Sequence, residues 1–361
     1  MRNGVSLIPS PQGTPSRCQP IRRMVGVLLL VLILGGCGTA ARTLPVEAGP
    51  QELLCCTRGE ETITLQYLGT GGWLFRMGDA SLLTAPFFSN PGLVRVGLGE
   101  LVPDTAAIDN QLPPVEDVPA ILVGHAHYDH LMDVPYIARR RAPDARVYGS
   151  RTAVNLLQGD PELDPGRLVE VESLAGDHEA AGEWIPVGDG RIRFMPLRSG
   201  HAPHFMGIHL YRGEQDEPAP RLPETAWGWL EGQPLAYLID FLDEGGDVAF
   251  RVHYQDAASE PPDGLPPPLE DGIPVDLVIL CPPGYQELTH YPEGILERTR
   301  PTLALLGHWE NFFRSATEEP SRAVPGTDLE AFIQRMEASL PEEAQWRMPN
   351  PGTVLRIGGR R

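Results

Sequence analysis

Short apolar segments separated by polar turns run along most of the chain, a pattern typical of a protein rich in β-strands. Residues 62–68 and 191–195 alternate apolar and polar side chains, which is the period of a strand with one buried face. Residues 118–123, 275–280 and 301–306 are almost continuously apolar, which is typical of strands buried on both faces. These segments predict a core built from sheets.

Two regions predict strands that are paired through tight turns. Residues 69–72 read Gly-Thr-Gly-Gly between strand-like runs, and they lack the Lys of a phosphate-binding loop. We therefore interpret them as a turn that allows close backbone approach. Residues 243–247 have hairpin composition and join the predicted strands 235–241 and 248–254.

Helical patterns are fewer and alternate with the strands. Residues 131–141 and 151–157 are predicted helices that each follow a predicted strand. Residues 329–340 place apolar side chains on one helix face, and either Thr327 or Asp328 can begin that helix. The alternation predicts the α/β fold class.

The predicted strand at 118–123 ends in the run Gly124-His125-Ala126-His127-Tyr128-Asp129-His130. Imidazole nitrogen and carboxylate oxygen are ligands that divalent transition metals prefer. Taken singly, His125 can be a hydrogen-bonded core residue, Asp129 a helix N-cap and His130 a surface residue. Packing does not explain three histidines and an aspartate within six residues, so we interpret the run as part of a metal site.

Other predicted strands also lead into residues that can bind metal. His201 follows the strand at 191–195, Asp256 follows the strand at 248–254, and His308 follows the strand at 301–306. Together with the first run they can build two adjacent metal sites, with an aspartate between them. Asp240 is an alternative for the shared aspartate.

This order of residues, His-x-His-x-Asp-His followed by a lone His, an Asp and a final His, resembles the metallo-β-lactamase superfamily. Within it, residues 69–73, residues 82–88 and His308-Trp309 are most similar to the branch that contains N-acylphosphatidylethanolamine-hydrolysing phospholipase D and related bacterial hydrolases. The resemblance implies a four-layer αβ/βα sandwich over residues 52–361, with the metal ions at one edge.

The resemblance also implies which residue binds which ion. The first ion takes His125, His127 and His201, the second takes Asp129, His130 and His308, and Asp256 lies between them. The family's shared aspartate usually follows a hairpin, which favours Asp256 over Asp240. Relatives often have Asp-Pro where this chain has Ala85-Pro86, so one supporting carboxylate is missing here.

Further residues are candidates for the pocket around the ions. His204 is a possible substrate contact or proton donor, and Trp309 and Glu310 are possible substrate contacts because they follow a ligand. Residues 213–234 are rich in Pro, Glu and Gly, and we expect them to form an insertion beside the site. Trp227 and Trp229 in it either line an apolar entrance or anchor the loop.

The expected chemistry is hydrolysis. Two divalent ions lower the pKa of water and hold a hydroxide nucleophile, with Asp129 and Asp256 as the catalytic carboxylates. Zinc is the default metal for such ligands, and manganese and iron remain open. The bond is an ester, lactone, amide or phosphodiester, and the resemblance favours a phosphodiester or lipid-derived substrate. Iron redox chemistry usually needs an added flavin domain, for which the chain has no room.

A non-catalytic alternative is a surface lipoprotein that keeps the fold for binding, but such a protein is expected to have lost ligands. The N-terminus favours a lipoprotein in either case. Arg22 and Arg23 precede an apolar run at 24–34, and Leu34-Gly35-Gly36-Cys37 resembles a bacterial lipobox. We expect residues 1–36 to be a signal peptide, Cys37 to carry lipid, and residues 37–51 to be a tether. This predicts an anchor in the bacterial cell envelope, at the outer membrane or periplasmic face.

The net charge of the chain limits which binding partners are expected, and its cysteines predict a disulfide. The formal charge of −19 argues against a nucleic-acid binder. A chain that starts at Cys37 has 25 basic and 48 acidic residues, and this excess of negative charge also opposes anionic membrane surfaces. In an oxidising compartment, Cys55 or Cys56 is expected to form a disulfide with Cys281.

Overall fold

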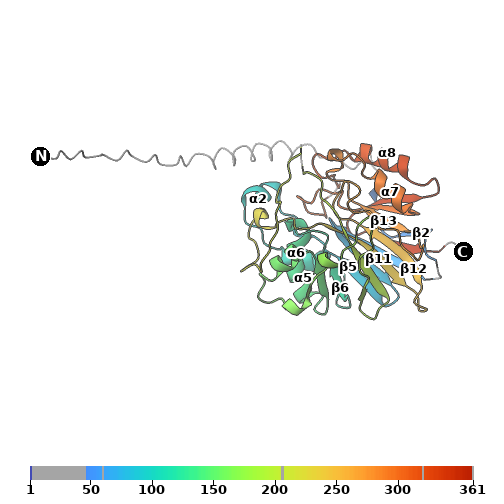
Figure 1. The fold of residues 1–361 in the computed structure, drawn as a ribbon, viewed down its shortest axis with the longest axis horizontal. Helices are drawn as coiled ribbons and strands as arrows, with labels where there is room; N and C mark the ends of the chain where they lie inside the picture. Colours follow the sequence, from blue (N-terminus) through green and yellow to red (C-terminus); the bar gives the residue numbers. More distant parts are fainter. Residues whose placement is uncertain (2–45, 59–60, 205–206, 319–320, 360–361) are drawn as a thin grey trace.

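Two eight-stranded sheets form the centre of the molecule (Figure 1). The structure is a computed structural model, and it describes residue 1 and residues 46–58, 61–204, 207–318 and 321–359. Both sheets are mixed, with antiparallel hairpins and parallel strands in each. The carboxyl ends of several of these strands carry the residues predicted to bind metal.

The first sheet contains the predicted hairpins and the strand before the His/Asp run. In spatial order its strands are β2 (Gln51–Leu54), β16 (Val354–Gly358), β3 (Ile63–Gly69), β4 (Gly72–Met77), β5 (Ala80–Thr84), β6 (Ala120–Leu122), β7 (Arg146–Gly149) and β8 (Leu168–Glu170). β3, β4 and β5 pair antiparallel, and β5, β6, β7 and β8 pair parallel.

The second sheet contains the other strands that lead to predicted ligands. In spatial order these are β1 (Val46–Glu47), β15 (Gln345–Pro349), β14 (Leu303–Leu306), β13 (Leu277–Leu280), β12 (Val248–Tyr254), β11 (Leu235–Leu242), β10 (Ile192–Arg198) and β9 (Ile185–Val187). β11 and β12 form the predicted hairpin, with Ile239 opposite Val252.

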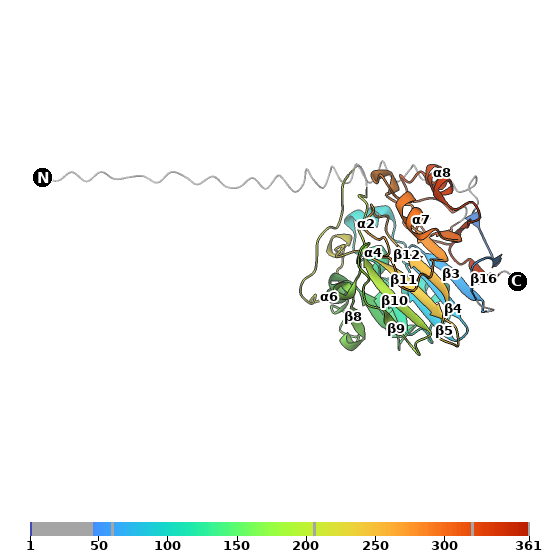
Figure 2. The ribbon, with the colours of Figure 1, turned by 45° about the vertical axis from the view of Figure 1, so that its right-hand side comes forward.

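Helices cover the outer faces of both sheets (Figure 2). Five of them pack in one apolar cluster with the first sheet: α2 (Leu93–Leu98), α3 (Thr105–Gln111), α4 (Tyr128–Leu131), α5 (Val134–Arg140) and α6 (Arg151–Leu157). α7 (Glu293–Thr299) and α8 (Leu329–Ser339) lie over the strands β13 and β14 of the second sheet (Figures 1 and 2).

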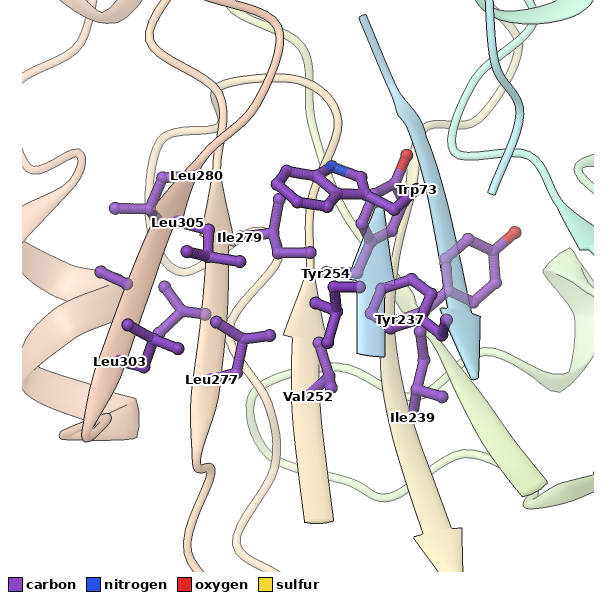
Figure 3. Close-up of a cluster of buried hydrophobic side chains, with 14 of the residues drawn as sticks. Trp73, Tyr237, Ile239, Val252, Tyr254, Leu277, Ile279, Leu280, Leu303 and Leu305 are labelled. Atoms are coloured by element: carbon purple, nitrogen blue, oxygen red, sulfur yellow. The ribbon is translucent and has the colours of Figure 1, made fainter. Parts of the chain in front are cut away.

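The main core lies between the two sheets. Tyr67, Trp73 and Phe75 of the first sheet are completely buried together with Tyr237 and Phe241 of the second. Figure 3 shows Trp73 beside Tyr254 and the aliphatic side chains of β13 and β14. The ring centroids of Phe75 and Phe241 are 5.8 Å apart, so the sheets interlock through aromatic side chains. The predicted αβ/βα sandwich is confirmed.

The helix predicted at 131–141 is instead two short helices, α4 and α5. It begins earlier than predicted, at Tyr128, and it is interrupted where Pro135 occupies the first turn of α5. Proline has no N–H to continue the hydrogen bonds of α4. The helices at 151–157 and 329–339 agree with the prediction, and Asp328 caps the latter by accepting from the Ala331 N–H.

The folded domain begins earlier than predicted. Val46 and Glu47 pair with Met348 and Pro349, so the end of the predicted tether belongs to a sheet. The predicted signal peptide, Cys37 and the tether up to residue 45 lie outside the described residues. No helix within the described ranges has the length and apolar character needed to cross a membrane.

The predicted disulfide to Cys281 is wrong. Cys55 and Cys56 are joined to each other just after the edge strand β2, whereas Cys281 is a free, buried thiol. Cys281 follows β13 inside the second sheet, where its N–H donates to the Tyr291 hydroxyl at 2.9 Å. The sheets thus hold the two cysteine positions apart.

Candidate metal centre

Residues from four strand ends of the two sheets meet at one edge of the sandwich. β6 leads into the His/Asp run and α4, β10 leads to His201, β12 to Asp256 and β14 to His308. Potential ligand atoms lie within 4.8 Å of one another in three groups: His125, His127 and His201; Asp129, His130 and His308; and His125, His130 and Asp256. The structure therefore brings together all the residues that the sequence placed at the two ions.

Asp256 lies between the two groups of ligands. Its Oδ1 is 3.1 Å from His125 Nδ1, and its Oδ2 is 3.0 Å from His130 Nδ1. On the other side of His130, the Nε2 atom lies 3.2 Å from His308 Nε2 and 3.5 Å from Asp129 Oδ2. A carboxylate in this position can contact two ions at once.

Several atoms of this cluster are buried without a hydrogen-bond partner. They are His125 Nε2, His127 Nε2 and His308 Nδ1. Each unsatisfied buried polar atom costs about 1–3 kcal/mol, so a native protein seldom keeps several together without a ligand. Nitrogen and carboxylate oxygen atoms in this arrangement fit divalent metal ions, which would remove that cost.

Hydrogen bonding fixes the orientation of one ligand ring. His201 Nδ1 lies 2.6 Å from the carbonyl oxygen of Ala202 and donates to it, which leaves Nε2 as the atom free to bind an ion. The His201 ring also lies 4.8 Å from the His125 ring and 4.9 Å from the His127 ring, measured between centroids. The three imidazoles therefore converge on one point.

The ionisable groups of the cluster influence one another strongly. Burial acts to raise the pKa of Asp129 and of Asp256, but the neighbouring imidazoles, His130 first, lower both pKa values below the usual range. Burial and the neighbouring imidazoles lower the pKa of His127 and His201. Ionised carboxylates and neutral imidazoles are the protonation states that bind metal.

Two glycines allow the backbone to approach this cluster closely. A Cβ atom on Gly124 would lie 2.1 Å from Asp256 Oδ1, and one on Gly71 would lie 2.8 Å from His130 Nδ1. Neither distance is sterically possible without movement. Gly71 belongs to the turn at 69–72, so the predicted close backbone approach occurs against a predicted ligand.

Glu310 supports the site from behind and does not line the pocket. Its carboxylate accepts from the Tyr67 hydroxyl and, at 2.6 Å, from the Thr70 N–H. Tyr67 in turn accepts from the His308 N–H at 2.7 Å, which holds His308 at a φ of 54°. The expectation that Glu310 contacts substrate is therefore wrong, because its carboxylate is turned into this network.

Trp309 is also not a substrate contact. Its side chain is completely buried, and its indole N–H donates to the Pro349 carbonyl at 2.9 Å. Asp240, the alternative for the shared aspartate, lies outside the cluster and accepts from the buried Arg251 guanidinium at 2.6 Å. Ala85, where relatives often have Asp, is completely buried in the apolar cluster beneath α2–α6.

A cavity of about 230 Å³ opens directly onto the metal ligands. His127, Asp129, His201, His204, Asp256 and His308 form one part of its wall. His204 Nδ1 accepts the Leu210 N–H at 3.2 Å, so in the neutral ring the proton is on Nε2. Burial lowers the pKa of His204 to about 4, which favours that neutral ring.

The insertion predicted beside the site lies there. Trp227 lines the cavity with 48% of its surface exposed, whereas Trp229 is buried at 1% exposure in the cluster below. One tryptophan is thus at the entrance and the other anchors the loop, so both expectations hold, each for one residue.

Glu231, at the end of the same insertion, was not predicted as a site residue. Its N–H donates to the Tyr211 carbonyl at 2.9 Å, and its carbonyl accepts from the Ala126 N–H at 3.1 Å. Its carboxylate Oε2 is buried, has no hydrogen-bond partner and lies 3.9 Å from His127 Nε2. Burial raises the pKa of Glu231 to about 7. In the sequence this residue looks like any other Glu of an acidic, Pro-rich loop.

The sequence was compared with those of known proteins and protein families. No protein-family model matches the chain. The chain is similar to a UPF0173 metal-dependent hydrolase of Cupriavidus taiwanensis, with 28% identity over 236 residues that cover 64% of this chain and 72% of the relative.

Two solved structures are similar at lower identity. Igni18, a metallo hydrolase of Ignicoccus hospitalis, is 15% identical with a TM-score of 0.47, over 82% of this chain and 98% of that one. The metallo-β-lactamase fold protein YhfI of Bacillus subtilis is 14% identical with a TM-score of 0.46, over 82% of this chain and 99% of that one.

Proposed function

We propose that this protein is a metal-dependent hydrolase that uses two divalent ions to cleave an ester-type bond. The observation that carries the proposal is the convergence of seven His and Asp side chains beside the cavity, where several buried imidazole nitrogens have no hydrogen-bond partner. The similarity to a protein named as a metal-dependent hydrolase supports it. Zinc fits these ligands best, with manganese and iron as the alternatives to test.

The ligand assignment follows from the three groups of atoms. His125, His127 and His201 would hold one ion, Asp129, His130 and His308 the other, and Asp256 would contact both. Divalent ions held by these residues would supply Lewis-acid chemistry, which polarises the bond to be cleaved and makes water a nucleophile at neutral pH.

Side chains that line the cavity would position the water molecule and the substrate and would transfer protons. Asp129 lines the cavity, and it keeps its negative charge, so it can orient a water molecule and accept a proton from it. His204 presents a neutral Nε2–H to the same cavity and can donate a hydrogen bond to the substrate oxygen that gains charge. The apolar part of the cavity favours a lipid-derived substrate.

The test combines metal content with turnover. The purified domain from residue 46 onward is analysed for bound metal and assayed on a phosphodiester, a lactone, a β-lactam, a carboxylic ester and a phospholipid. We expect about two ions per chain and hydrolysis of at least one substrate. His127→Ala and Asp256→Ala are each expected to lower the number of bound ions per chain and to lower kcat/KM at least 100-fold.

A matched control distinguishes the site from a general effect of losing a histidine. His178→Ala removes a side chain that is 40% exposed and lies outside the cluster, so metal content and turnover are expected to equal those of the parent. A parent protein that binds no metal after incubation with zinc, manganese or iron would refute the proposal and leave the binding lipoprotein as the better description.

We further propose that Cys37 carries a lipid that anchors the protein in the cell envelope. The basic pair, the apolar run and the Leu-Gly-Gly-Cys sequence support this. Mass spectrometry of the full-length protein expressed in a bacterium is expected to find an acylated Cys37 as the first residue. In the Cys37→Ser variant, the protein is expected to leave the membrane fraction. An unprocessed parent chain would contradict the anchor.

A further inference from the structure

The cavity above the metal ligands has one polar side, and the rest of its wall is apolar. The apolar part comes from three regions of the chain: Leu93 and Val96 of α2; Ile208, Leu210 and Tyr211 just before the insertion together with Trp227 within it; and Phe312, Phe313, Val324 and Pro325 after β14. Its volume of about 230 Å³ compares with the ~10–15 Å³ that one water molecule needs. The space is therefore large enough for a substrate chain, and the wall favours a hydrocarbon.

The described residues of the cavity wall include acidic side chains but no arginine. All 29 basic residues of the sequence are arginines, yet none of the described residues that line the cavity is an arginine. The charged side chains at the wall are the carboxylates of Asp129 and Asp256. Arginine forks are the usual protein partners of phosphate and carboxylate groups. An anionic substrate would therefore have the metal ions but no arginine fork to hold its charged group.

The polar side of the wall matches an uncharged carbonyl group. His204 offers one N–H donor beside the ligands, and its ring stacks on that of His201 with centroids 4.8 Å apart. One donor and the ions suffice for a single carbonyl oxygen. A phosphodiester has two non-bridging oxygens and a full negative charge, and the described wall offers no arginine fork beside the ions to bind them.

The apolar surface continues from the cavity to the outside. Ile208 and Trp227 both line the cavity and are 46% and 48% exposed. The Trp227 ring packs edge-on against Tyr211, whose φ is 58°, so the entrance has a defined shape. Apolar side chains therefore lie both at the exposed entrance and inside the cavity, where they can contact a chain of methylene groups.

Resting on the proposed function, we propose that the substrate is an electrically neutral carboxylic ester or lactone whose hydrocarbon chain lies between α2, the insertion and Phe312–Phe313. In the reaction, the oxygen of water bonds to the carbonyl carbon and the bond from that carbon to the alkoxy oxygen breaks. One proton of the water passes to the alkoxy oxygen, so that a carboxylic acid and an alcohol result. No oxidant or reductant takes part.

The first test is the dependence on chain length and charge. The zinc-loaded protein is assayed on p-nitrophenyl esters from acetate to decanoate and on bis-p-nitrophenyl phosphate. Burying one methylene group favours binding about three- to fourfold, so kcat/KM is expected to rise by about that factor for each added methylene until the cavity is filled. The phosphodiester is expected to be cleaved at least 100-fold more slowly than the octanoate ester.

A pair of variants on one helix locates the chain. Leu93→Trp fills the cavity from α2 and is expected to lower the ratio of decanoate to acetate kcat/KM about tenfold. Leu98→Trp makes the same change on the same helix at a position that is 52% exposed and outside the cavity, and the ratio is expected to stay at the parent value.

The outcomes separate this inference from the proposed function. If no substrate is hydrolysed in a metal-dependent way, the proposed hydrolase itself fails. If metal-dependent hydrolysis occurs but kcat/KM is independent of chain length, or the phosphodiester is the better substrate, the hydrolase stands and the neutral acyl substrate is refuted. An equal effect of the two tryptophan variants would also overturn the placement of the chain.

Discussion

Replacing Gly124 by alanine tests the metal centre with a single methyl group. The Cβ atom would lie 2.1 Å from Asp256 Oδ1 and 2.3 Å from both Cγ and Oδ2. Gly124 does not have a positive φ, so its backbone conformation suits alanine and the effect is purely steric. The carboxylate must retreat by about 1 Å to reach an ordinary contact distance. It then leaves its position 3.1 Å from His125 and 3.0 Å from His130.

The size of the effect follows from this displacement. Misplacing a reacting or positioning group by ~1 Å costs about 100-fold in rate, and disturbing the partners of a ligand costs about 10- to 100-fold in metal affinity. We therefore expect Gly124→Ala to lower kcat/KM about 100-fold and to release zinc to a competing chelator at least tenfold more readily.

The control for this variant is Gly92→Ala, whose added Cβ atom would meet nothing within 4 Å. It is expected to match the parent in chelator competition and in turnover. Gly124→Ala should also keep the parent's far-ultraviolet circular dichroism spectrum, because β6 ends before it. A folded Gly124→Ala protein with the parent's metal affinity would show that Asp256 is not held where the ions bind.

Three further predictions concern stability. Tyr67→Phe leaves the Glu310 carboxylate and the His308 N–H short of a buried partner, so urea denaturation should give a free energy of unfolding lower by roughly 1–3 kcal/mol; an unchanged value would contradict the network. Burial lowers the pKa of His253 to about 4, below its value in the unfolded chain, so the free energy of unfolding should fall as the pH drops from 6.5 through 4. In His253→Gln, the difference between the free energies of unfolding measured at pH 7 and at pH 4 should be smaller than in the parent by roughly 3 kcal/mol. Equal differences in the two proteins would refute this prediction. Removing metal with a chelator should lower the Tm, and adding zinc back should restore it, whereas a Tm indifferent to metal would count against a filled centre.

The metal ligands were predictable from the sequence because each segment that carries them comes soon after a strand. The strand β6 is a short apolar run, and the residues after it are close in sequence, so His125 to His130 form a recognisable motif. His201, Asp256 and His308 each lie alone, but each also follows a strand, and strand ends meet at a sheet edge. The pattern of the strands therefore also indicated where the ligands come together.

Other features depend on contacts that a sequence pattern does not show. The break between α4 and α5 depends on Pro135, and the carboxylate of Asp133 there accepts from the Phe88 and Ser89 N–H groups, a contact 45 residues away in sequence. Glu310 was placed in the pocket because it follows a ligand, but the left-handed backbone at His308 turns it towards Tyr67. Neither the helix break nor the orientation of the Glu310 side chain can be predicted from the spacing of residues in the sequence.

The metal ligands and the cavity wall come from different parts of the fold, which explains why the substrate is harder to predict than the reaction. The ligands sit on the ends of buried strands, where packing between two sheets leaves little freedom. The cavity wall is assembled from α2, the insertion and the segment around Phe312, which are far apart in sequence and lie outside the strands. Substitutions in these segments should change which substrate chain is accepted while the metal affinity stays constant. The substrate therefore has to be inferred from the assembled wall, where apolar side chains and the absence of arginine among the described lining residues favour a neutral acyl chain.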